Sequence, residues 1–79
     1  MPETELYDHE YVVIGCGALG FGVVKELAKK NKKVLAVDVS KERVEVLRDE
    51  NYDAIIGDAK DVELYKSFDF SKTSVILLL

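Results

Sequence analysis

Short apolar runs alternate along this chain with segments in which apolar residues recur at helical spacing. The runs are rich in valine, isoleucine and leucine, which is typical of parallel strands buried on both faces. The segments between them are amphipathic, so they predict helices that pack against a sheet. The predicted strands are residues 11–14, 33–38, 53–57 and 73–79, and the predicted helices are residues 18–30, 41–50 and 61–68.

Signals at the ends of the predicted helices support these boundaries. Asn31 follows the cationic last turn of the first helix and can adopt the left-handed conformation that often ends a helix. Ser40 and Asp61 are placed to cap the starts of the second and third helices through their side-chain oxygens. The only proline is Pro2, so no proline interrupts a predicted element.

Strands and helices in alternation indicate an α/β fold with a Rossmann-like, doubly wound parallel sheet. Four strands, expected in the order 3-2-1-4, and three helices make about half of such a sheet, so we expect it to be incomplete. Residues 11–79 form the expected nucleotide-binding domain, and residues 1–10 an N-terminal extension. The apolar run 75–79 predicts an uncovered sheet edge, and hence either a domain that continues further or an obligate oligomer.

Composition narrows the class of protein. The formal charge of −4 and the pI near 4.9 disfavour a nucleic-acid partner, because few cations are available to neutralise phosphates. The acidic segment 1–10 does not resemble an export signal, and no apolar run approaches the ~20 residues of a membrane-spanning helix. A single cysteine suits a reducing compartment. We therefore expect a cytoplasmic domain that does not insert into a membrane.

The first predicted strand ends in the segment Gly15-Cys-Gly-Ala-Leu-Gly20, which has the spacing G-x-G-x-x-G. Between a buried strand and an amphipathic helix, this spacing predicts a site for the pyrophosphate of a dinucleotide. Gly15 would allow the tight turn, Gly17 would let the backbone approach the pyrophosphate, and Gly20 would let the helix pack closely against the sheet. A structural glycine turn without a ligand is the alternative.

Backbone N–H groups at the start of the helix, at Ala18 and Leu19, are expected to point at the phosphates, where the helix dipole favours an anion. Cys16 completes the set of cofactor-binding residues in the turn. No general base accompanies its thiol, so we interpret it as a small residue that fits the turn and not as a nucleophile. His9 is the only histidine, which leaves no material for a catalytic triad or a metal site.

Asp38 ends the second predicted strand, 18 residues after Gly20. A carboxylate there can accept hydrogen bonds from both hydroxyls of the adenosine ribose and would repel a 2′-phosphate, so it favours NAD over NADP. Val39 follows it among the predicted cofactor-binding residues. At the end of the third strand, Asp58 and Ala59 can contact adenine, or the segment can instead be a turn in which Asp58 caps a helix. Mechanism alone leaves these two alternatives open.

The whole pattern resembles the TrkA-N family, also called the RCK or KTN nucleotide-binding domain, over residues 11–79. The matching segments are Val-Val-Ile-Gly-Cys-Gly-Ala-Leu-Gly20, Val-Leu-Ala-Val-Asp38 with the helix that follows it, and Gly57-Asp-Ala59, which is the most specific of them. The resemblance implies that Asp58 and Ala59 contact adenine. Many members carry an arginine inside the glycine turn, whereas this chain has Ala18 and Leu19 there.

In this family, such domains form cytoplasmic dimers or octameric rings that regulate potassium channels and transporters, and they catalyse no reaction. The resemblance implies a regulatory homo-oligomer that binds NAD, NADH or an adenine nucleotide (ATP, ADP or AMP) and acts on the membrane subunit of a potassium channel or transporter. The same domain is also fused to other modules, including phosphoesterase-like ones in archaea. The alternatives are the cofactor-binding half of an NAD-dependent oxidoreductase and a structural remnant whose site is vestigial.

Overall fold

Four parallel strands form one sheet in the order β3-β2-β1-β4, in a computed structural model that describes residues 5–79. Along the chain the elements are β1 (Tyr11–Ile14), α1 (Ala18–Lys29), β2 (Val34–Asp38), α2 (Lys41–Asp49), β3 (Asp53–Ile56), α3 (Val62–Lys66) and β4 (Val75–Leu78). The predicted fold class, strand order and elements are confirmed. Several elements are one to three residues shorter than predicted, because helices and strands fray at their ends.

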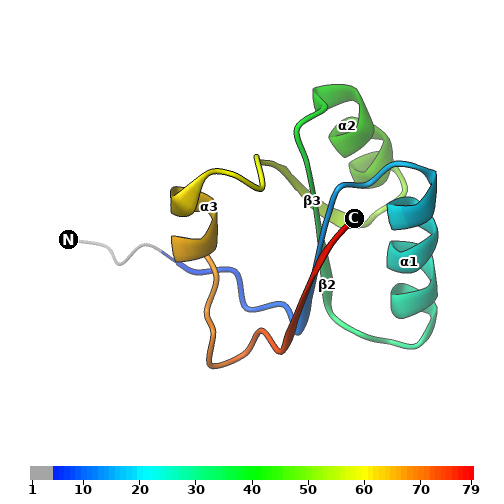
Figure 1. The fold of residues 1–79 in the computed structure, drawn as a ribbon. Helices are drawn as coiled ribbons and strands as arrows, with labels where there is room; N and C mark the ends of the chain where they lie inside the picture. Colours follow the sequence, from blue (N-terminus) through cyan, green and yellow to red (C-terminus); the bar gives the residue numbers. More distant parts are fainter. Residues whose placement is uncertain (1–4) are drawn as a thin grey trace.

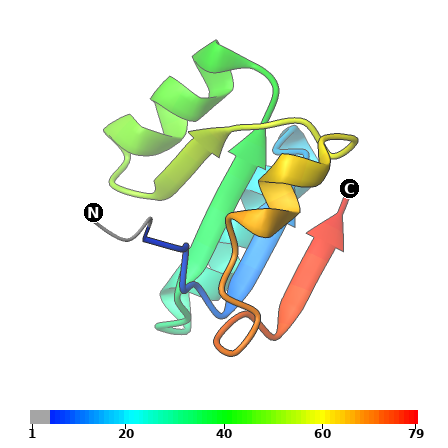
Figure 2. The ribbon, with the colours of Figure 1, turned by 90° about the vertical axis from the view of Figure 1, so that its left-hand side faces the viewer.

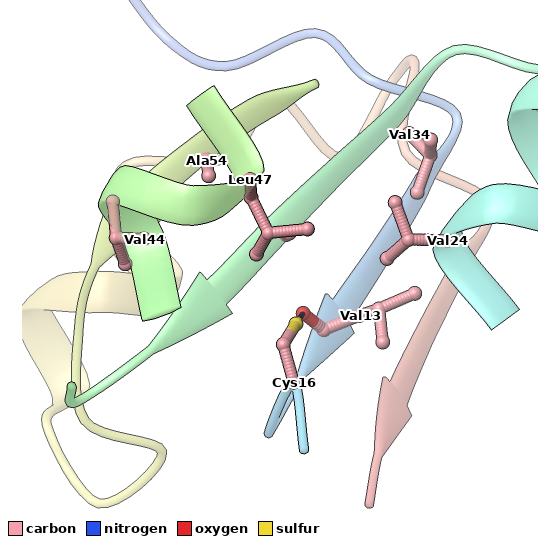
Figure 3. Close-up of a cluster of buried hydrophobic side chains, with 8 residues drawn as sticks. Val13, Cys16, Val24, Val34, Val44, Leu47 and Ala54 are labelled. Atoms are coloured by element: carbon pink, nitrogen blue, oxygen red, sulfur yellow. Dashed lines mark hydrogen bonds between the residues drawn. The ribbon is translucent and has the colours of Figure 1, made fainter. Parts of the chain in front are cut away.

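The helices cover both faces of the sheet. α1 and α2 lie on one face and α3 lies on the other (Figure 1; Figure 2). Because side chains alternate along a strand, Val13 and Ala36 pack beneath α1 and α2, in the cluster of Figure 3. Val12 and Leu35 pack against α3 on the opposite face. Burial on both sides explains the continuous apolar runs of β1 and β2.

The two longer helices end in the same way. Asn31 and Asn51, which follow α1 and α2, have φ angles of 60° and 69°, in the left-handed region. The N–H of Lys32 donates to the Leu27 carbonyl at 3.0 Å and closes a Schellman turn, and an equivalent bond closes α2. The role predicted for Asn31 is confirmed. No helix within residues 5–79 has the length and apolar character needed to cross a membrane.

The segment before β1 is attached to the domain. Tyr7 forms a parallel bridge with Phe68, and the Thr73 hydroxyl donates to the His9 carbonyl at 2.6 Å. The buried His9 ring places its Nε2 atom 2.7 Å from a carboxylate oxygen of Asp53. Residues 7–9 of the predicted N-terminal extension are thereby tied to β3 and to the connection between α3 and β4.

The carboxyl ends of the four strands meet at one edge of the sheet, because the strands are parallel (Figure 2). Ile14 pairs with Val37, which brings the glycine turn beside Asp38. β2 lies between β1 and β3 and pairs with both, so the loop after β3 reaches the same edge of the sheet. The three loops that carry the predicted site residues therefore converge.

Candidate functional site

Gly15 turns the chain from β1 towards α1. Its φ of 96° lies in the left-handed region, and a Cβ atom there would lie 2.6 Å from the carbonyl oxygen of Leu79. Its N–H donates to the Val37 carbonyl at 2.8 Å, which continues the β1–β2 pairing by one residue. Glycine adopts this conformation without strain, so the tight turn predicted at Gly15 is confirmed.

Gly17 and Gly20 have different surroundings. A Cβ atom on Gly20 would overlap the carbonyl oxygen of Gly15, so the start of α1 packs against the end of β1 only because this side chain is missing. A Cβ atom on Gly17 would meet nothing within 4 Å. The open space beside Gly17 is what an approaching ligand requires.

The start of α1 is available to an anion. α2 and α3 begin with side-chain caps from Ser40 and Asp61, as predicted, and each has a glutamate in its first turn. Within residues 5–79, α1 has neither a side-chain cap nor an acidic residue in its first turn. The N–H groups of Ala18 and Leu19 belong to this uncapped first turn, where a negatively charged ligand is favoured.

Asp38 is a buried carboxylate that holds the glycine turn. It is 3% exposed. One carboxylate oxygen accepts from the N–H of Cys16 at 2.6 Å, and the other accepts from the N–H of Ser40 at 2.8 Å. This link between β2 and the turn adds to the predicted contact with ribose. Each oxygen has a further lone pair, and Asp38 lines a cleft at the carboxyl ends of the strands.

The surroundings of Asp38 keep it ionised. Burial alone would raise its pKa, but the N–H groups of Ser40 and Cys16 and the guanidinium of Arg43 outweigh burial and hold the pKa below its ordinary value of 3.8. A carboxylate with a lowered folded-state pKa stabilises the fold above its unfolded pKa. That stabilisation is lost as the pH falls through the folded pKa. At neutral pH the cleft lined by Asp38 therefore contains a fixed negative charge.

Arg43 is a functional candidate that the sequence pattern did not reveal. It lies in the first turn of α2, with its Nη1 atom 3.6 Å from a carboxylate oxygen of Asp38. The side chain is 59% exposed and lines the space around the glycine turn. Its position three residues after the cap Ser40 is a usable signal, because the helix after a parallel strand starts at the edge where the glycine turn lies.

Two adjoining clefts form one groove along the carboxyl edge, called here the carboxyl-edge groove. The first cleft has a volume of about 250 Å³, and its lining includes Asp38, Val39, Gly57, Asp58 and Ala59. The second has a volume of about 300 Å³, and its lining includes Gly15, Gly17, Ala18, Leu19 and Gly20. Gly15, Arg43 and Leu79 line both clefts. The structure thus brings together every predicted cofactor-binding residue except Cys16.

Cys16 points away from the groove. Its buried side chain belongs to the core cluster beneath α1 and α2 (Figure 3). The Sγ atom lies 3.6 Å from the carbonyl oxygens of Val13 and Val37, and burial raises the pKa of the thiol. A protonated thiol in the core agrees with the interpretation that Cys16 is no nucleophile. Cys16 contacts the site through its backbone N–H, which donates a hydrogen bond to the Asp38 carboxylate.

The loop after β3 places Asp58 and Ala59 at the rim of the groove. The exposed Asp58 carboxylate accepts from the N–H of Lys60 at 2.9 Å, whereas the side chain that caps α3 is Asp61. Asp58 therefore holds a turn, as the alternative supposed, but it does not cap the helix. The Tyr65 hydroxyl donates to the Ala59 carbonyl at 2.6 Å and attaches this loop to α3. No signal in the sequence indicates that contact.

The fold and the groove together define a class of protein. A buried strand, a glycine turn at a helix start and an acidic residue at the end of the next strand are the parts of a Rossmann-type dinucleotide-binding domain. The family model for the TrkA-N domain matches residues 11–79. The chain belongs to the TrkA-N domain family, as its resemblance to that family indicated.

A solved structure agrees with this assignment. The NAD(P)-binding domain of an exopolyphosphatase-related protein from Archaeoglobus fulgidus is 49% identical in sequence to this chain, and the two superpose with a TM-score of 0.87. The matched region covers 90% of this chain and 53% of that chain, so this chain spans about half the length of the solved structure. No curated protein sequence matches this chain.

Proposed function

We propose that this chain is a regulatory module that binds NAD or NADH in the carboxyl-edge groove and catalyses no reaction itself. The observation that carries the proposal is that one groove unites an open glycine turn at the start of α1 with an ionised Asp38 at the end of β2. The turn suits a pyrophosphate, and Asp38 suits the adenosine ribose. The description of the structural neighbour as NAD(P)-binding supports a nicotinamide dinucleotide. ATP, ADP and AMP share its adenosine and phosphate and form a second class of ligand.

Two kinds of target fit such a module. Membership of the TrkA-N family favours a cytoplasmic oligomer that controls a potassium channel or transporter. The 49% identity to a domain of an exopolyphosphatase-related protein favours control of a phosphoesterase-type enzyme instead. Assays of the protein as it occurs in the cell distinguish the two targets. NADH should alter potassium flux in the first case and phosphate release from polyphosphate in the second. Steady consumption of NADH would instead favour an oxidoreductase.

Ligand binding is tested on the purified chain. Heating should release NAD or NADH that co-purifies, and mass spectrometry of the supernatant identifies it. The ligand-free chain should then bind NAD in a calorimetric titration. If calorimetry shows no heat and the backbone amide resonances of the glycine turn do not shift with millimolar NAD, the proposed function is wrong.

The wild-type chain should bind NAD more tightly than NADP, because the ionised Asp38 would lie against a 2′-phosphate. Asp38→Ala should weaken NAD binding by about 1.5–3 kcal/mol, the contribution of hydrogen bonds to a charged group. Calorimetric titrations with both dinucleotides measure these differences. Asp38→Asn is the matched control, since it keeps one acceptor oxygen for the N–H of Cys16 or Ser40 but loses the charge. Equal wild-type affinities for NAD and NADP would contradict the role of Asp38.

We expect the 79-residue chain to self-associate. β4 lies at the margin of the sheet, and Leu78 and Leu79 are 63% and 53% exposed. Burying about 400 Å² of such surface would contribute roughly 10 kcal/mol at ~25 cal/mol per Å², against an association cost of about 4–15 kcal/mol. Light scattering at micromolar concentration measures the mass, and Leu78→Glu should shift it towards the monomer. A wild-type monomer of 8.9 kDa would contradict this expectation.

A further inference from the structure

Arg43 lies where the two clefts of the carboxyl-edge groove meet. Its side chain lines both the cleft beside Asp38 and the cleft over the glycine turn. Its Nη1 atom is 3.6 Å from the same Asp38 oxygen that accepts the N–H of Cys16. Because 59% of the side chain is exposed, the guanidinium keeps donors free on the side that faces the groove.

The charges around the groove favour a cation at this position. Asp38 and Asp58 both line the groove, and the whole chain carries a net charge of −4. A pyrophosphate would bring further negative charge close to the ionised Asp38. Of the residues that line the two clefts within the described part of the chain, Arg43 alone is cationic. The glycine turn itself contributes the uncharged side chains of Ala18 and Leu19.

We propose that Arg43 binds the pyrophosphate of the nucleotide while it neutralises Asp38, and so makes the groove selective for phosphate-bearing ligands over adenosine. The inference rests on the proposed function. A guanidinium presents five N–H donors in a planar fork, so it can engage a carboxylate and a phosphate at the same time. A lysine in this place would supply the charge without the fork.

Titrations followed by nuclear magnetic resonance, with NAD, NADP, ADP and adenosine as ligands, test the role of Arg43. Arg43→Gln should weaken the binding of NAD and ADP by about tenfold to a hundredfold, the loss expected for hydrogen bonds to a charged group. Its affinity for adenosine should stay within about twofold of wild type, because adenosine has no phosphate. Arg43→Lys should recover part of the loss. Thermal melts without ligand confirm that each variant is folded.

Lys41→Gln is the matched control. It removes the same charge from the same turn of α2, at an exposed residue that does not line the groove. All its affinities should stay within about twofold of wild type, since screening weakens an exposed charge that does not contact the ligand. If Lys41→Gln weakens NAD binding as much as Arg43→Gln does, the effect comes from the total positive charge near the start of α2. That result would overturn the proposal.

Three results with Arg43→Gln overturn the proposal in different ways. Unchanged NAD affinity would remove the phosphate contact. An equal loss for adenosine would mean that Arg43 acts only by holding Asp38 in place. A loss confined to NADP would assign the guanidinium to the 2′-phosphate. If the wild-type chain binds none of the four ligands, the proposed function itself fails, which is a distinct outcome from these three.

Discussion

A Gly17→Val variant is expected to lose NAD binding by at least about a hundredfold while it keeps its fold. Gly17 is the residue before α1, and the space beside it is open where the pyrophosphate is expected. A valine side chain there would hold the pyrophosphate away from the first N–H groups of the helix. Each hydrogen bond to a charged group contributes about 1.5–3 kcal/mol, so losing two of them suffices for this effect.

The fold should survive because the backbone at Gly17 suits any residue. Its φ of −71° and ψ of −160° lie in the extended region, and a Cβ atom meets nothing within 4 Å. Valine is a poorer helix N-cap than glycine, at a cost on the order of 1 kcal/mol. That cost is small against the roughly 4–12 kcal/mol expected for a chain of this length. Circular dichroism melts and NAD titration of the same sample measure both properties.

Gly22→Val is the matched control for Gly17→Val. Gly22 lies within α1, and a Cβ atom there would also meet nothing within 4 Å, but the residue faces away from the carboxyl-edge groove. Its NAD affinity should stay within about twofold of wild type, because the phosphate turn is untouched. A folded Gly17→Val protein with wild-type NAD affinity would remove the assignment of the glycine turn to the pyrophosphate.

Gly20→Ala should lower the free energy of unfolding by about 1–3 kcal/mol, the usual cost of overpacking. The added Cβ atom would overlap the carbonyl oxygen of Gly15. Gly15 cannot yield easily, because its φ is left-handed and its N–H is bonded to the Val37 carbonyl. α1 must therefore move away from β1, which should also weaken NAD binding at the displaced turn.

Gly22→Ala makes the same chemical change two residues later in α1 and should have the opposite sign. With nothing within 4 Å of the new methyl group, alanine should gain up to about 1 kcal/mol from its higher helix propensity. Urea denaturation at fixed pH measures both variants against wild type. If Gly20→Ala is as stable as wild type, the close approach of α1 to β1 does not depend on the missing side chain.

The elements of the fold and the place of the glycine turn could be predicted from the order of residues alone. Strand and helix periods, the caps Ser40 and Asp61 and the left-handed Asn31 are set by interactions within a few residues. The need for glycine at Gly20 is equally local, since its neighbour is the carbonyl oxygen of Gly15. The left-handed φ of Gly15 is local too, whereas its contact with Leu79 arises only in the folded sheet. Such local features are visible in the sequence itself.

The pairing of the polar groups in the site was decided by tertiary structure. The strand pattern placed Asp38 at the end of β2, but the pairing of Ile14 with Val37 directs its carboxylate to the N–H of Cys16, 22 residues away. A pattern of apolar residues does not specify this register to the atom. The sequence pattern therefore predicted that Asp38 binds ribose, but it did not predict the N–H groups of Cys16 and Ser40 that hold the Asp38 carboxylate.

Tertiary packing also explains why Arg43 and Tyr65 lie at the site. Packing of α2 on the sheet brings Arg43 within 3.6 Å of Asp38, and packing of α3 on the other face brings the Tyr65 hydroxyl to the Ala59 carbonyl at 2.6 Å. Both side chains stay partly exposed, so burial does not dictate these contacts. Which partner is within reach depends on how strands and helices are placed in space, and only the folded chain sets that placement.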